Sequence, residues 1–117
     1  MKNFFDLQRF ANIDNSKPNK VVNGTSSNDS IANGGSIVTI NAGAGNDTIN
    51  NTGSLVKIYT ATGADSVYNN GGDNATISTA EGDDTIHGYY GDYVSIVGGA
   101  GNDSIGIDYG SGSTIDG

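Results

Sequence analysis

Five aspartates recur at nearly constant spacing along the chain, each directly followed by Ser or Thr and then by Ile or Val. The spacings are 18, 18, 19 and 19 residues, and the aspartates are Asp29, Asp47, Asp65, Asp84 and Asp103. Glycine stands two residues before the last four of them. Carboxylates, together with carbonyl groups that glycine turns towards one space, are the ligands that a hard cation such as Ca²⁺ prefers. The pattern therefore predicts a column of calcium-binding turns.

Electrostatics supports a bound cation in this column. If the repeats stack as coils, neighbouring carboxylates lie about 4.8 Å apart. They repel by roughly 1 kcal/mol in water and by about 3–4 kcal/mol at an effective dielectric constant of 20. Cations between them would convert this repulsion into attraction, so we expect a calcium-dependent fold. Mg²⁺ suits such turns less well because it keeps more of its water. The alternative is a metal-free Asp/Asn ladder that accepts hydrogen bonds from turn amides.

A second periodic series, of aliphatic residues, predicts the fold. Ile40, Ile58, Ile77, Ile96 and Ile115 each end a short alternating segment, at 38–40, 56–58, 75–77, 94–96 and 113–115. Alternation places Val38 and Ile40 inward and Thr39 outward. We predict an all-β, parallel β-roll or β-solenoid of about five coils of 18–19 residues over 21–117. Two parallel sheets would face each other across a thin aliphatic core.

The two turns of each coil differ in length. Seven residues always separate the second-series aliphatic residue from the next Asp, whereas 11 or 12 separate that Asp from the following aliphatic residue. The extra residue falls in the turn opposite the Asp. We therefore expect one column of metal sites, and an Asn/Gly-rich stack of turns on the other edge.

These turns resemble the Gly-Gly-x-Gly-x-Asp-x-aliphatic-x nonapeptide of repeats-in-toxin proteins. "GGAGNDSIG" at 98–106 matches every position, and "AGAGNDTIN" at 42–50 lacks only the first Gly. The segments at 60–68 and 79–87 keep one Gly, the Asp and the aliphatic residue, and the segment at 24–32 is the weakest. The family usually carries the motif in both half-turns of a coil, whereas this chain has it in one. The resemblance implies a bacterial calcium-binding β-roll with a metal set of Asp29, Gly43, Gly45, Asp47, Gly63, Asp65, Gly82, Asp83, Asp84, Gly99, Gly101 and Asp103.

Composition narrows the function. The chain has 117 residues, of which 34% are hydrophobic, and a net charge of −8 that argues against nucleic-acid binding. It has no cysteine and no apolar run of the roughly 20 residues that a membrane span needs. The single histidine, His87, occupies a repeating outward position, so we expect no enzyme activity. Weak oxygen-only sites fill at extracellular calcium levels, so we expect an extracellular or cell-surface protein, although no export route is evident.

Residues 1–20 form a separate segment in this interpretation. They contain four basic and two acidic residues, whereas 21–117 contains one basic and eleven acidic residues. Apolar residues at helical spacing predict a short amphipathic helix or arm, followed by a linker at 12–19. This arm could cap its own first coil, dock on another subunit, or be ordered incidentally. The repeats end in phase with their beginning, which suggests head-to-tail stacking into a filament. The residues that we expect in such assembly are Phe4, Phe5, Leu7, Phe10 and Ile115.

The leading hypothesis is thus an extracellular, calcium-loaded structural solenoid that polymerises with itself. The alternative is a monomeric, adhesin-like binding module that recognises ice or glycans. It would use outward hydroxyl ladders and four tyrosines. The first ladder is Ser30, Thr48, Ser66, Thr85 and Ser104, the second is Thr39, Lys57, Thr76, Ser95 and Thr114, and the tyrosines are Tyr68, Tyr89, Tyr90 and Tyr93.

Overall fold

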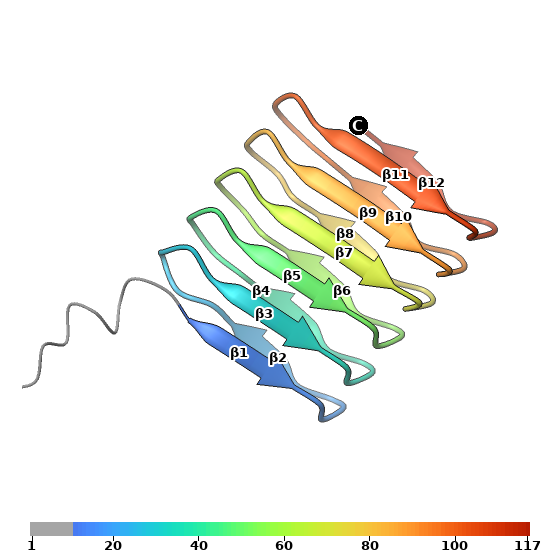
Figure 1. The fold of residues 1–117 in the computed structure, drawn as a ribbon, viewed down its shortest axis with the longest axis horizontal. Helices are drawn as coiled ribbons and strands as arrows, with labels where there is room; N and C mark the ends of the chain where they lie inside the picture. Colours follow the sequence, from blue (N-terminus) through green and yellow to red (C-terminus); the bar gives the residue numbers. More distant parts are fainter. Residues whose placement is uncertain (1–10) are drawn as a thin grey trace, which may run out of the picture.

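The structure is a computed structural model that describes residues 11–117. Its twelve short strands form two six-stranded parallel sheets, which confirms the predicted all-β solenoid (Figure 1). The first sheet holds the odd-numbered strands β1 (Asn12–Asn15), β3 (Ser30–Asn33), β5 (Thr48–Asn51), β7 (Ser66–Asn70), β9 (Thr85–Tyr89) and β11 (Ser104–Asp108). The second holds β2 (Val21–Asn23), β4 (Thr39–Asn41), β6 (Lys57–Tyr59), β8 (Thr76–Ser78), β10 (Ser95–Val97) and β12 (Thr114–Asp116).

The coils stack in the register that the sequence repeat predicts. Ile31 pairs with Ile49, Ile49 with Val67, and Val67 with Ile86 along the first sheet. A parallel stack in register requires each residue to lie over its counterpart one repeat later, so the spacing in the sequence is the register in the sheet. Both hydroxyl ladders also lie in register along the outer faces of the sheets.

The solenoid has about six turns, one more than expected. The additional turn arises because the segment 12–19, expected to be a linker, contains strand β1, which precedes β2 of the predicted repeat region. Ile13 pairs with Ile31 and thereby extends the aliphatic column, and Asn15 pairs with Asn33. The solenoid therefore begins before residue 21, where its first residue was expected. The expected helix, with Phe4, Phe5, Leu7 and Phe10, lies outside the described residues.

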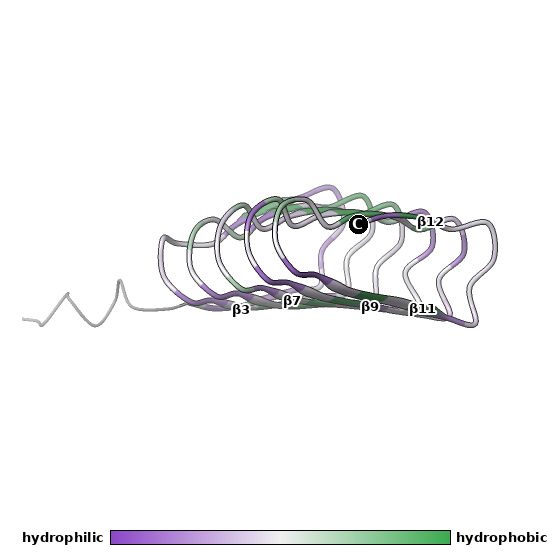
Figure 2. Cartoon of the chain, turned by 90° about the horizontal axis from the view of Figure 1, so that it is seen from above, coloured by the Kyte–Doolittle hydropathy of each residue, from purple (hydrophilic) through white to green (hydrophobic). Residues whose placement is uncertain are grey.

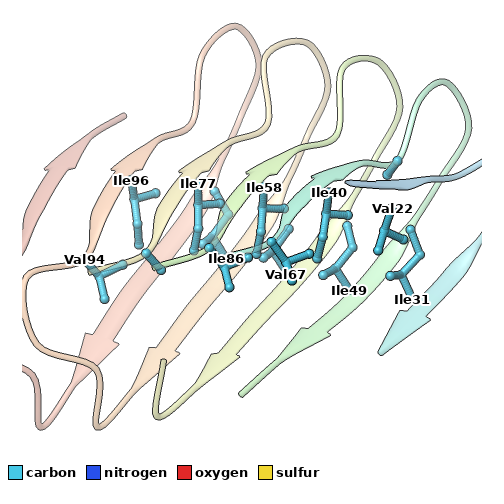
Figure 3. Close-up of a cluster of buried hydrophobic side chains, with 14 residues drawn as sticks. Val22, Ile31, Ile40, Ile49, Ile58, Val67, Ile77, Ile86, Val94 and Ile96 are labelled. Carbon is cyan, nitrogen blue, oxygen red and sulfur yellow. The ribbon is translucent and has the colours of Figure 1, made fainter. Parts of the chain in front are cut away.

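Two facing columns of Ile and Val fill the space between the sheets (Figure 3). Figure 2 shows the two sheets as separate layers, with hydrophobic residues in their strands. Ile40, Ile58 and Ile77 from one sheet and Ile49 and Val67 from the other are all 0% exposed. No single coil could bury these side chains alone, so the core exists only because neighbouring coils cover one another. Ile115 of the last strand is 51% exposed.

A ladder of asparagines, half-buried at Asn15 and buried from Asn33 onward, lines the edge opposite the Asp turns. The Nδ2 of Asn15 donates to the Oδ1 of Asn33 over 2.8 Å, Asn33 donates to Asn51 over 2.8 Å, and Asn51 donates to Asn69 over 2.7 Å. The ladder stops there because Gly88 and then Ile107 follow in register. The extra residues of the longer coils lie in this same edge, as predicted. They are Gly71, Tyr90 and Tyr109, with φ values of 89°, 58° and 61°.

Within the described part of the chain, no helix is long and apolar enough to cross a membrane.

Candidate functional site

The Asp column runs along one edge of the solenoid, in the turns that lead into the odd-numbered strands (Figure 1). Asp47, Asp65 and Asp84 are each 1% exposed, and Asp29 is 3% exposed. Asp103, in the last coil, is half-buried. The carboxylates are therefore inside the turns and not on their outer surface, which is costly for a charge unless it is paired or bonded.

One oxygen of each carboxylate is used by the backbone. The amide of each Asp donates to the Oδ1 of the Asp one coil later: Asp29 to Asp47 over 2.8 Å, Asp47 to Asp65 over 2.8 Å, Asp65 to Asp84 over 2.8 Å, and Asp84 to Asp103 over 3.0 Å. The amide ladder that we considered as the alternative to metal binding is thus present. It occupies only one oxygen of each of these side chains.

The second oxygen is different. The Oδ2 atoms of Asp47, Asp65 and Asp84 are buried and have no hydrogen-bond partner among the residues that the structure describes. A buried carboxylate oxygen without a partner carries the full cost of its desolvation. These three atoms come from consecutive coils of one column, so they mark a shared feature of the turn.

Asp29 does not share this feature. Its Oδ2 accepts from the Thr25 amide over 2.6 Å, and its Oδ1 accepts from the Thr25 hydroxyl over 2.8 Å and from the Ala11 amide over 2.7 Å. Both oxygens are satisfied by the protein itself. The structure therefore separates Asp29 from the rest of the predicted metal set.

Burial raises the pKa of two carboxylates in the middle of this column. Desolvation, reinforced by the neighbouring carboxylates of Asp65 and Asp29, raises the pKa of Asp47 to about 6. Desolvation, with the Asp84 carboxylate, also raises the pKa of Asp65, although the nearby Thr60 hydroxyl and the Asp47 amide act in the opposite direction. A proton can satisfy an orphan oxygen at acidic pH, but a group with a pKa near 6 is mostly ionised at pH 7.5. Above pH 6, Asp47 therefore carries a buried negative charge whose Oδ2 has no partner among the described residues.

This predicts how the metal-free fold responds to pH. Because folding raises the pKa of Asp47 from 3.8 to about 6, the folded state binds more protons than the unfolded state between these values, and its stability falls as pH rises. We expect the Tm in EDTA to drop by roughly 5–10 °C between pH 4.5 and pH 7.5, measured by circular dichroism. Asp47→Asn should flatten the profile. A Tm that rises over this range in the wild-type protein would contradict the assignment.

The glycines of the turn are required by close stacking. A Cβ on Gly63, Gly82 or Gly101 would overlap the carbonyl oxygen of the glycine one coil earlier, and their φ values are 130°, 141° and 133°. Gly45 lies in the same column, where a Cβ would meet the Ser27 backbone. The turns therefore contain a row of stacked glycine carbonyl groups, two residues before the aspartates in the chain.

The second glycine of the resembled motif is less strictly kept. Gly43 and Gly99 have φ values of 100° and 99°, and the same place in the other coils is held by Ala61 and Ala80 at 75° and 71°. The left-handed conformation thus persists where alanine must adopt it, at a cost of about 1–2 kcal/mol per residue.

Asp83 does not join the buried column. It is exposed, and its Oδ1 accepts from the Asn102 amide one coil later over 2.9 Å. Asn28 and Asn46 do the same for Asn46 and Ala64. Adjacent residues of each turn thus accept in opposite directions along the solenoid axis, which clamps each coil to both neighbours.

Sequence reasoning missed three contacts at or near the site. Thr25 donates hydrogen bonds to both oxygens of Asp29. The sequence marked it only as a departure from the Gly or Ala found at this place in later coils. Ala11 supplies an amide donor to the column although it lacks a carboxylate. His87, expected simply as an exposed strand residue, lies 3.0 Å from the Asp108 carboxylate and stacks on Tyr89.

No family model, no curated protein and no solved structure matches the chain. Functional inference therefore depends on the geometry of the Asp column and of the outer surface.

Proposed function

We propose that the chain is a structural β-solenoid module whose Asp turns bind Ca²⁺. The observation that carries this proposal is the set of three buried, unpartnered Oδ2 atoms in consecutive coils, at Asp47, Asp65 and Asp84. They are hard anionic donors, they are in register, and at neutral pH they require a compensating positive charge. No lysine or arginine side chain of the described residues forms an ion pair with these carboxylates. A divalent cation would supply the positive charge instead.

Each proposed site is shared between two coils. In the described part of the chain, no group of three or more Asp, Glu, His or Cys side chains is placed to hold a metal. The ligands would therefore be two carboxylates from adjacent coils, completed by carbonyl oxygens of the glycine column and by water. The pairs are Asp47 with Asp65 and Asp65 with Asp84, with the more open pair Asp84 and Asp103 at the end. We leave Asp29 and Asp83 out, because the oxygens of the first are satisfied and the second points outward.

Calcium fits this donor set better than magnesium. Ca²⁺ accepts six to eight oxygens in flexible geometry, whereas Mg²⁺ demands a near-ideal octahedron. Sites of this kind typically have a Kd of about 10⁻⁴–10⁻³ M, which corresponds to an extracellular or cell-surface setting. The bound ions would hold adjacent coils together, so we propose a scaffolding role and no enzymatic one.

The direct test is a calcium titration of the intact chain. We expect isothermal titration calorimetry to detect Ca²⁺ binding, and 10 mM Ca²⁺ to raise the Tm by roughly 10 °C or more relative to EGTA at pH 7.5, since ligand that binds only the folded state stabilises it. Mg²⁺ at the same concentration should have a much smaller effect. Equal Tm values in Ca²⁺ and in EGTA would overturn the proposal.

End-to-end association is a second candidate function. Strands β1 and β2 at one end and β11 and β12 at the other each pair on one side only within the described residues. In a head-to-tail contact, Ile105 would continue the column of Ile13, and Ile115 that of Val22. The Asp103 amide, however, would face Ala11, which has no carboxylate. We therefore propose a contact that is weaker than those between internal coils.

Such an association should depend on concentration. Light scattering in millimolar Ca²⁺ should show the mean mass rising with protein concentration, and Ile115→Lys should suppress the rise because it places a charge in the shared apolar column. A mass that stays at the 11.9 kDa of one chain at all concentrations would contradict association.

A further inference from the structure

The tyrosines are concentrated on the edge opposite the Asp column. Of the six tyrosines in the chain, five lie in β7, in β9 or in the turns that follow β9 and β11. They are Tyr68, Tyr89, Tyr90, Tyr93 and Tyr109. One edge of the solenoid therefore carries the buried carboxylates, and the other carries aromatic rings in its later coils.

Two of these rings form an exposed stack. Tyr90 and Tyr109 occupy the extra position of consecutive coils, and their ring centroids lie 5.1 Å apart with planes inclined by 11°. They are 67% and 79% exposed. Both residues have left-handed backbone conformations, which are unfavourable for bulky side chains. Strain of this kind persists where the surrounding structure holds it, and it is concentrated at functional sites.

The stack has an open position on its inner side. Gly71 holds the same extra position one coil earlier, and its amide donates to the Tyr89 carbonyl over 2.7 Å, which fixes the register. A Cβ placed on Gly71 would have no atom within 4 Å. Because Tyr109 covers one face of Tyr90, the other face is directed towards the coil of Gly71. The space above Gly71 can therefore accept one flat ring that continues the stack.

The surroundings of this position decide which ring it suits. Asn70 and Asp73 belong to the same turn as Gly71, and the Oδ1 of Asp73 accepts from the Asp92 amide over 2.9 Å, so the Asp73 carboxylate lies between the coils of Gly71 and Tyr90. The Oδ1 of Asp92 instead accepts from Ser111, in the coil of Tyr109. No lysine or arginine occurs after Lys57, which disfavours an anionic ligand. A sugar ring combines an apolar face of C–H groups, which packs on an aromatic ring, with hydroxyl groups at its rim that donate to carboxylates. A purely aromatic ligand would leave this polar rim unused.

We propose that the face of Tyr90 and the open position above Gly71 bind one neutral pyranose ring. Asn70 and Asp73, in the turn of Gly71, accept hydrogen bonds from its rim hydroxyls. This site is separate from the calcium sites, and it remains testable if those are absent. A single stacked ring binds weakly, so the affinity for one monosaccharide is in the millimolar range.

The test is NMR titration of the full chain with methyl β-glucoside, methyl β-galactoside and methyl β-N-acetylglucosaminide. We expect at least one to shift the amide signals of Gly71 and Tyr90 and to receive saturation transfer from the tyrosine rings. Methyl β-glucuronide, which is anionic, should bind at least tenfold more weakly. The absence of binding by all three neutral sugars, or equal binding of the glucuronide, would overturn the proposal.

Two variants locate the site. Tyr90→Gly removes the ring at a position whose backbone favours glycine, and Gly71→Tyr fills the open position with a third ring. Each should weaken sugar binding at least tenfold, whereas Tyr59→Ala on the other sheet should leave it unchanged. Thermal denaturation establishes that each variant is folded. Unchanged binding by folded Tyr90→Gly, or binding of phenol in preference to the sugars, would refute the assignment.

Discussion

Gly82→Ala is expected to destabilise the solenoid by about 3 kcal/mol and to lower its Tm by roughly 10–15 °C. A Cβ at this position would overlap the Gly63 carbonyl oxygen, and the φ of 141° is rarely adopted by residues that carry a side chain. The coils of Gly63 and Gly82 cannot separate locally to make room, because the Asp65 amide donates to the Asp84 carboxylate and the Gly63 amide donates to the Glu81 carbonyl. A loss of this size is a large share of the 5–15 kcal/mol that stabilises a typical domain.

Gly71→Ala is the matched control. Gly71 also has a positive φ, of 89°, but an added Cβ meets nothing within 4 Å. Only the backbone preference changes there, so the expected loss is about 1 kcal/mol. Urea denaturation of both variants measures the difference, which isolates the steric part of the effect. Equal losses would show that the carbonyl stacking at Gly82 does not limit the structure.

The fold was largely predictable because a parallel, in-register stack converts sequence spacing directly into spatial position. Ile40, Ile58 and Ile77 repeat at 18 and 19 residues, and they lie over one another in the core. The longer coils place their extra residue in the opposite turn, as counting alone indicated. Such predictions need no knowledge of side-chain geometry.

The first coil escaped prediction because it lacks the features on which the counting depended. Ala11 stands where the later coils have Asp, and the only proline, Pro18, suggested a linker. Ile13 and Asn15 nevertheless continue the aliphatic column and the asparagine ladder. Tertiary stacking on β3 thus defines this strand more strongly than its own turn residues do.

The site could be located but not resolved from the sequence. Spacing indicated that the five aspartates share a column. Their burial, and the hydrogen bond that each Oδ1 accepts from a backbone amide, depend on side-chain direction and could not be counted. The neighbours Asp83 and Asp84 illustrate the difficulty. They are adjacent in the chain, yet one faces solvent and accepts from the coil after it, while the other is buried and accepts from the coil before it.

Asp65→Asn is expected to lower the stability of the protein in calcium but not in the presence of a chelator. Asp65 belongs to both of the central pairs proposed here, so the variant should lose two sites. At a Kd of about 10⁻⁴ M, each site contributes about 2.7 kcal/mol in 10 mM Ca²⁺, and the loss of two approaches about 5 kcal/mol. The Tm in calcium should therefore fall by roughly 15–25 °C relative to the wild-type protein.

In EGTA the same variant should be at least as stable as the wild-type protein at pH 7.5. The asparagine Oδ1 can still accept from the Asp47 amide, so the ladder bond is kept, while the buried charge is removed. The new Nδ2 also replaces a buried oxygen that has no hydrogen-bond partner among the described residues. The neutral side chain also removes a like charge from between two carboxylates.

Asp73→Asn separates this effect from a general response to lost charge. The Oδ1 of Asp73 also accepts a hydrogen bond from a backbone amide of the next coil, that of Asp92, over 2.9 Å. Asp73, however, lies in the opposite turn. Its replacement should change the Tm by the same small amount in calcium and in EGTA. If Asp65→Asn lowers the Tm equally in both solutions, the carboxylate serves only the amide ladder. A change of sign between the two solutions requires a cation that binds at Asp65, since no purely structural role of the side chain depends on free calcium.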